Sequence, residues 1–120
     1  MRPTVLIVDD HPGFRSLARK LLAAGGFEVV GEAADGHAAI DAARELRPDV
    51  VLLDIQLPGI DGFEVAERLR DGAAGPAVVL VSSRDRADYG ARVEQCGARG
   101  FIPKAELSVD AMRALMGATG

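Results

Sequence analysis

The sequence predicts an α/β domain in which a parallel sheet is covered by helices on both faces. Short apolar runs, typical of buried strands, recur along the chain, and stretches with helical spacing of apolar residues separate them. This strict alternation favours βα units joined by right-handed crossovers. The 120 residues match one domain of ordinary size, long enough to bury a core without disulfides or metals.

Five segments are predicted to form the strands. Four are apolar runs, and the second is a short segment rich in β-branched residues. The predicted strands are residues 4–8, 28–33, 50–54, 77–81 and 99–102.

Five segments between and after the strands are predicted to form helices. The first follows Asp10, with residues 14, 17, 18, 21 and 22 at helical spacing, and Gly25-Gly26 ends it. The next three are residues 36–46 (apolar face 39, 40, 43 and 46), 62–70 (65, 66 and 69 inward) and 87–96. Ser108 is expected to cap a last helix with residues 111, 114 and 115 inward, and residues 117–120 are expected to fray.

Charged side chains follow three of the predicted strands at the point where each strand ends. Asp9 and Asp10 come after the first strand, Asp54 ends the third, and Lys104 follows the fifth. The carboxyl ends of parallel strands share one edge, which is where open α/β sheets bind ligands. Three carboxylates in one pocket repel each other, so we expect a cation between them, and Mg²⁺ (or Mn²⁺) suits oxygen ligands.

Composition narrows the class of protein further. The net charge is −4 and no strongly basic stretch occurs, so we expect no direct nucleic-acid binding by this chain. With no tryptophan and one tyrosine the core must be mainly aliphatic, and the one cysteine, Cys96, is expected to be a small core residue. No signal peptide or membrane-length apolar run is recognised, so the expected location is the cytoplasm.

Taken in order, the residues at the strand ends resemble those of bacterial two-component response-regulator receiver domains. The resemblance covers essentially the whole chain and is greatest to receivers attached to helix-turn-helix effectors. It is carried by Asp9-Asp10, Asp54, the Leu-Pro-Gly-Ile-Asp-Gly stretch at 57–62, Ser82 and Lys104.

This resemblance implies a fold and a function. The fold is the flavodoxin-like (βα)5 arrangement of one domain over residues 1–120, with strand order 2-1-3-4-5 and helices on both faces. The function is to accept a phosphoryl group from a histidine kinase on Asp54. The implied response is a change of the face around helix four, strand five and helix five that controls a downstream output such as transcription.

The resemblance also implies roles for single residues. Asp10 would bind Mg²⁺ directly and Asp9 through water, with Asp54 and the backbone carbonyl of Gln56 as further ligands. Lys104 and Ser82 would stabilise the phosphoryl group.

Ser82 and Phe101 would form the conformational switch that the family implies. Many receivers carry threonine and tyrosine at these positions, so Ser82 keeps the hydroxyl while Phe101 lacks one. Many also carry proline after the lysine, where this chain has Ala105. A homodimer on phosphorylation and a DNA-binding effector outside this chain are the further partners to expect.

Several alternatives remain open from the sequence. The aspartates after the strands could be helix N-caps only, and Ser83 could take the place of Ser82. His11 could be a proton shuttle or an exposed residue at the start of a helix, and Tyr89 could lie on a partner surface or cover the edge of the core. The chain could instead be an aspartate-nucleophile phosphatase, although such enzymes have Asp-x-Asp after strand one, or a receiver used only for protein interaction.

Overall fold

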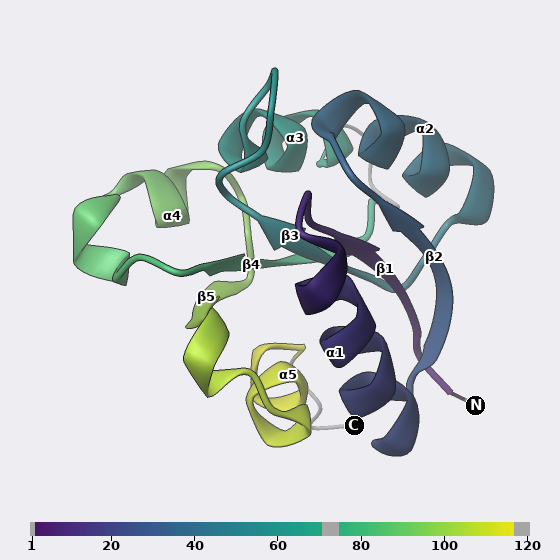
Figure 1. The fold of residues 1–120 in the computed structure, drawn as a ribbon. Coiled ribbons are helices and arrows are strands. Elements are labelled where there is room, and N and C mark those ends of the chain that lie inside the picture. The colour runs from purple at the N-terminus through teal and green to yellow at the C-terminus, as the bar shows by residue number, and fades with distance from the viewer. Residues whose placement is uncertain (1, 71–74, 117–120) are drawn as a thin grey trace.

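Five parallel strands form one sheet in the order β2-β1-β3-β4-β5, as the resemblance implied (Figure 1). The computed structural model describes residues 2–70 and 75–116. The predicted fraying of residues 117–120 lies outside the described residues. The strands are β1 (Thr4–Val8), β2 (Glu28–Ala33), β3 (Val50–Asp54), β4 (Ala77–Ser82) and β5 (Gly100–Pro103).

Helices cover both faces of this sheet. In Figure 1, α1 and α5 lie on one face, and α2 and α3 lie on the other. The helices are α1 (Pro12–Ala24), α2 (Gly36–Leu46), α3 (Gly62–Leu69), α4 (Arg92–Gln95) and α5 (Val109–Leu115). Two short 3₁₀ helices, at Arg86–Asp88 and Lys104–Glu106, precede α4 and α5.

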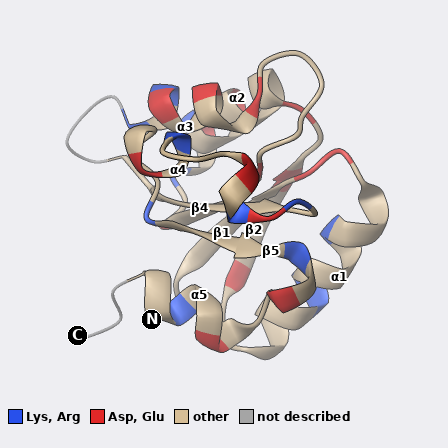
Figure 2. Cartoon of the chain, turned by 90° about the vertical axis from the view of Figure 1, so that its left-hand side faces the viewer, with Lys and Arg blue, Asp and Glu red and all other residues tan. Residues whose placement is uncertain are grey.

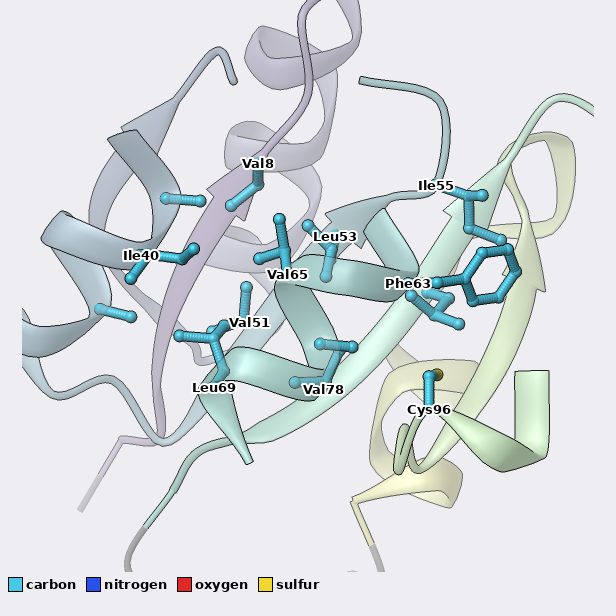
Figure 3. Packing of buried hydrophobic residues seen from close by; sticks show 14 of the residues in the cluster. Val8, Ile40, Val51, Leu53, Ile55, Phe63, Val65, Leu69, Val78 and Cys96 are labelled. Carbon is cyan, nitrogen blue, oxygen red and sulfur yellow. The ribbon is translucent and has the colours of Figure 1, made fainter. Parts of the chain in front are cut away.

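The central strands are apolar on both sides because each side faces a layer of helices. Successive side chains of a strand point to opposite faces. Leu6, Leu53 and Leu80 therefore join one core cluster, and the neighbouring residues Ile7 and Leu52 join the other. Figure 3 shows the first cluster, in which residues of α3 pack over β1 and β3. The labelled side chains are Val8, Ile40, Val51, Leu53, Ile55, Phe63, Val65, Leu69, Val78 and Cys96. Cys96 is buried, as predicted.

The predicted helix over residues 87–96 is wrong in extent. The structure has a 3₁₀ turn at Arg86–Asp88 and a one-turn α4 at Arg92–Gln95. Gly90 lies between them with a φ of +59°, a left-handed conformation that interrupts a right-handed helix. The interruption turns Tyr89 toward the sheet, where it packs against the core that Figure 3 shows.

The predicted apolar faces of three helices need smaller corrections. Among the described residues, Leu17 and Leu46 are the large apolar side chains that stay exposed, at 59% and 41%. Each lies at the margin of its helix's buried stripe, so the helical period alone misplaces it. In α5 the buried residue is Met112, which the sequence did not single out, whereas Ala114 is exposed.

Most element boundaries match the prediction. Strands β1, β2 and β3 and helix α2 have the predicted bounds, and Ser108 caps α5 by accepting a hydrogen bond from the Ala111 N–H. Strand β4 extends to Ser82 and β5 runs one residue later than predicted, from Gly100 to Pro103. Within the predicted helix 62–70, α3 ends at Leu69, one residue early.

Charged residues are spread over several elements. Figure 2 shows basic and acidic residues interspersed on the molecule, with only basic residues on α1 and both signs on α5. None of the helices in the described ranges 2–70 and 75–116 has the length and apolar character needed to cross a membrane.

Candidate functional site

The residues predicted to act together come from the carboxyl ends of four strands. Asp9 follows β1, Asp54 ends β3, Ser82 ends β4, and Lys104 follows β5. Because all the pairings are parallel, these ends lie on one edge of the sheet. The side chains of Asp9, Asp54 and Ser82 are buried although they are polar.

Asp54 is held by the turn that leads from β3 to α3. Its Oδ1 accepts a hydrogen bond of 3.2 Å from the Gln56 N–H. The Gly62 N–H donates to the Ile55 carbonyl at 2.8 Å, which brings the start of α3 against the end of β3. A Cβ at Gly62 would lie only 2.5 Å from the backbone oxygen of Asp54. Glycine is therefore needed at residue 62 to let the helix approach the site.

The acidic pair after β1 has two different environments. Asp9 is buried, and its Oδ1 accepts the His11 N–H at 2.8 Å. The Asp10 side chain is 36% exposed, with Oδ1 lying 3.0 Å from Nδ1 of His11. The same Nδ1 lies 3.1 Å from Oδ1 of Asp9, so the imidazole, which is 68% exposed, spans both carboxylates.

Lys104 supplies the positive charge of the site. Its Nζ lies 2.7 Å from Oδ2 of Asp9 and 3.6 Å from Oδ2 of Asp54. The contact between Lys104 and Asp9 lies outside hydrogen-bond geometry, so it is a contact of opposite charges. Oδ2 of Asp9 and Oδ2 of Asp54 both lack a hydrogen-bond partner among the described residues. The ammonium also lies 4.6 Å from the centroid of the Phe14 ring on α1, a cation–π contact.

The three aspartates of the site carry more negative charge than the Lys104 ammonium offsets. Burial, and after it the charge of Asp9, raise the pKa of Asp54 to about 6, although Lys104 and the Gln56 N–H act in the other direction. One ligand atom from each of Asp9, Asp10, His11 and Asp54 lies within 4.8 Å of the others. Two buried carboxylate oxygens without a hydrogen bond in such a cluster fit a bound cation.

The two predicted switch residues lie on neighbouring strands. Ser82 is paired in register with Pro103, and Phe101 lies two residues before Pro103 on β5. The Ser82 Oγ accepts the Arg84 N–H at 3.0 Å and lies 2.6 Å from the Tyr89 hydroxyl. Phe101 is half-buried, with its ring centroid 6.0 Å from that of Tyr89.

The sequence leaves the roles of His11 and Tyr89 open and places Phe14 only on a helix, and it does not predict the contacts of these three residues with the site. For His11, its position next to the acidic pair was the clue in the sequence. In the structure the imidazole is exposed and also contacts the carboxylates of Asp9 and Asp10. For Phe14 and Tyr89 no signal of spacing was available. Each reaches its partner, Lys104 or Ser82, through the packing of a helix or loop on the sheet.

The fold and the arrangement of acidic residues define a receiver domain, and comparison with known families agrees. Residues 5–116 match the sequence profile of the response regulator receiver domain. The chain belongs to this family, whose members are the regulated components of two-component systems.

Among the similar proteins, a putative transcriptional regulator of Pseudomonas aeruginosa is 43% identical over 102 residues, which are 85% of this chain and 49% of that protein. The probable transcriptional regulatory protein NarL of Mycobacterium tuberculosis is 38% identical over 113 residues, 93% of this chain and 52% of the relative. The chain thus spans about half the length of the curated relatives it matches.

A solved structure agrees with the fold. The chain resembles a two-component response regulator of the LuxR family from Aurantimonas sp. SI85-9A1 with a TM-score of 0.88 and 30% identity, covering 98% of this chain and 87% of the other. The two sequence relatives are thus named as transcriptional regulators, and the solved structure is a response regulator of the LuxR family.

Proposed function

We propose that this receiver domain accepts a phosphoryl group on Asp54 from the phosphohistidine of a kinase. The observation that carries the proposal is the position of Asp54. It is buried at the carboxyl edge of the sheet, its Oδ2 accepts no hydrogen bond, and Lys104 lies 3.6 Å from that oxygen. A carboxylate so placed is available as a nucleophile.

The residues fit a hard divalent cation such as Mg²⁺ or Mn²⁺. The donor set is dominated by carboxylate oxygens, and two of the buried oxygens lack a hydrogen bond. Asp10, Asp54 and the Gln56 backbone carbonyl would hold the ion directly, and Asp9 through water. Asp10 suits direct coordination because it is the more exposed of the pair, whereas Oδ1 of Asp9 accepts the His11 N–H and Oδ2 of Asp9 faces the Lys104 ammonium. When bound, the cation neutralises charge on the transferring phosphoryl oxygens.

The transfer itself needs no other nucleophile. A carboxylate oxygen of Asp54 forms a bond to phosphorus while the bond from phosphorus to the kinase imidazole breaks. The electron pair of that bond stays on the imidazole nitrogen, and the product is an acyl phosphate. Attack needs the ionised carboxylate, and with a pKa of about 6 Asp54 is mainly ionised at neutral pH.

Two side chains of this chain would stabilise the phosphoryl group. The Lys104 ammonium already faces Oδ2 of Asp54 and brings positive charge to the new oxygens. Ser82 ends the strand beside β3 and offers a hydroxyl to one of them. The attraction between Ser82 and the phosphoryl group would move the loop after β4 and, with it, Phe101.

The proposed output is a change in the face formed by α4, β5 and α5. Exposed charged side chains on this face include Arg92, Glu94 and Arg99. Since the relatives are transcriptional regulators about twice as long as this chain, we propose a cytoplasmic protein whose DNA-binding effector lies outside these residues. Phosphorylation would promote a homodimer through the same face, which sedimentation measurements with and without beryllofluoride would detect.

Intact mass spectrometry tests the assignment of the acceptor. The chain is incubated with acetyl phosphate and Mg²⁺, and one added phosphoryl group is expected. Asp54→Asn should abolish this adduct, and the matched change Asp41→Asn on the exposed surface of α2 should not. An adduct of unchanged yield in Asp54→Asn would contradict the assignment. Continuous turnover of a small phosphate ester would favour a phosphatase instead.

A further inference from the structure

Tyr89 contacts the hydroxyl that the proposed switch depends on. The Tyr89 hydroxyl and Ser82 Oγ lie 2.6 Å apart, at the short end of hydrogen-bond distances between hydroxyls. Ser82 is fully buried, so water does not replace this partner readily. Phe101 has no hydroxyl, and a tyrosine from the loop between β4 and α4 provides one near the switch.

The ring of Tyr89 connects Ser82 to two other elements. It packs edge-on against Phe63, at the start of α3, with ring centroids 5.5 Å apart. It also lies 6.0 Å from Phe101 on β5, at an interplanar angle of 55°. Movement of the Tyr89 ring would therefore disturb aromatic packing against α3 and against β5, a strand of the proposed output face.

The Phe63 side of this contact continues to the surface. The Arg92 guanidinium of α4 lies 4.2 Å from the centroid of the Phe63 ring. Its Nη2 also lies 3.3 Å from Oδ2 of Asp61, the residue that caps α3. Tyr89 thus contacts Ser82 at one end and, through Phe63, an exposed arginine of α4 at the other.

We propose that Tyr89 is a positioning residue that holds the Ser82 hydroxyl away from the acceptor, and that phosphorylation of Asp54 breaks this hydrogen bond and moves the Tyr89 ring. The inference rests on the proposed function of Asp54. It adds that the aromatic residue which responds directly to Ser82 is Tyr89, with Phe101 responding through Tyr89.

Competition for one short side chain is the physical reason. A serine hydroxyl has one hydrogen and two lone pairs, and the Arg84 N–H already uses one lone pair. Phosphoryl oxygens accept hydrogen bonds, so Ser82 must direct its hydrogen to them. Oδ2 of Asp54 accepts no hydrogen bond in the structure, whereas Ser82 contacts Tyr89. Either hydroxyl could donate in this contact. In the proposed resting state Ser82 donates to the Tyr89 oxygen, so turning its one hydrogen toward a phosphoryl oxygen breaks that hydrogen bond.

The composition of the chain provides a direct optical test. The sequence contains no tryptophan and one tyrosine, so intrinsic emission reports Tyr89 alone. Titration of the 120-residue chain with beryllofluoride and Mg²⁺, which mimic the phosphoryl group, should give a saturating change in this emission. The change should be absent in Asp54→Asn and strongly reduced in Ser82→Ala.

A double-mutant cycle separates the effect of the Tyr89 hydroxyl from the effect of its ring. Tyr89→Phe keeps the ring and its packing on Phe63 and removes only the hydroxyl. Because the hydrogen bond to Ser82 opposes the switch, Tyr89→Phe should lower the dissociation constant for beryllofluoride, followed by amide NMR shifts, by about 2- to 10-fold. With Ser82→Ala already present, the same change should alter that constant by less than about twofold. A purely structural role of the hydroxyl would have the same effect in both backgrounds.

The outcomes distinguish this inference from the proposed function. Amide NMR shifts that depend on Asp54 show whether beryllofluoride binds. If it binds, but emission stays constant and Tyr89→Phe leaves the dissociation constant unchanged, the role of Tyr89 is overturned and the acceptor assignment stands. If binding does not depend on Asp54, the proposed function itself fails, and this inference fails with it.

Discussion

Lys104 faces Asp9 more closely than it faces Asp54. The ammonium lies 2.7 Å from Oδ2 of Asp9 and 3.6 Å from Oδ2 of Asp54. Asp9 is buried, so much of the energetic role of Lys104 in the structure is to offset the charge of a neighbour of the proposed acceptor. The lysine thereby contributes both to the stability of the fold and to the proposed chemistry, and these two contributions can be measured separately.

Removing the charge of Lys104 should destabilise the chain. Lys104→Met keeps most of the stem but leaves the Asp9 carboxylate buried without its opposite charge. We expect the free energy of unfolding at neutral pH to fall by on the order of 2 kcal/mol, measured by urea denaturation. Lys20→Met, on the exposed surface of α1, is the control and should stay within about 0.5 kcal/mol of the parent. Equal stability of the Lys104 variant and the parent would show that the contact with Asp9 is energetically neutral.

Asp54 should make the stability of the chain fall as pH rises from about 4 to about 6. Its pKa is about 6 in the folded chain and 3.8 ordinarily, mainly because of burial. Across this window the folded chain holds a proton that the unfolded chain has released. The unfolded state binds fewer protons, so the Asp54 contribution to the free energy of unfolding is present below pH 3.8 and is lost as pH rises through 6.

Asp54→Asn should abolish the fall in the free energy of unfolding that accompanies rising pH. At pH 7.5 without divalent cations, the variant is expected to exceed the parent in free energy of unfolding by on the order of 2 kcal/mol. The difference should shrink toward the acid end of the window, where Asp54 is protonated in both states of the parent. Denaturation at several pH values measures the difference, with Asp41→Asn as a matched surface control. A difference that does not depend on pH would contradict the raised pKa.

Asp10 should dominate the affinity for Mg²⁺. Its side chain is the more exposed of the acidic pair and faces the exposed imidazole of His11, so it can turn toward an ion at little cost. In amide NMR titrations, Asp10→Ala should lose the Mg²⁺-dependent shifts around Asp54 that the parent shows. Asp41→Ala changes the net charge equally, away from the site, and should retain them. Parent-like Mg²⁺ affinity in Asp10→Ala would rule out the proposed ligand set.

Gly62→Ala should disturb the acceptor through the backbone. The added Cβ would lie 2.5 Å from the Asp54 oxygen and 2.7 Å from the Ile55 Cα, so the start of α3 or the end of β3 must shift. We expect a loss of about 1–3 kcal/mol in the free energy of unfolding, together with slower phosphorylation by acetyl phosphate. Gly13→Ala is the control, because a Cβ there meets nothing within 4 Å. In a helix it should leave stability equal or slightly higher. Similar behaviour of the two variants would contradict this close approach.

The pattern of the sequence predicts the ends of β1 and β3 and the aspartates placed there. Apolar runs of strand length predict β1 and β3 with the bounds that the structure has, because strands buried on both faces admit few polar residues. Once the strands are parallel, Asp9 and Asp54 must lie on one edge of the sheet. The acidic cluster at this edge therefore follows from the local sequence pattern together with the rule that the carboxyl ends of parallel strands lie on one edge of a sheet.

The pairing of these groups depends on how the helices and loops pack on the sheet. The short α4 depends on the left-handed turn at Gly90, which a helical periodicity of apolar residues does not reveal. That turn brings Tyr89 to Ser82, and the packing of the strands brings Lys104 nearer to Asp9 than to Asp54. Periodicity reports which side of an element is buried. A distance of a few ångströms between side chains on different elements depends on how the helices and loops pack on the sheet, and the spacing of residues along the chain does not contain that information.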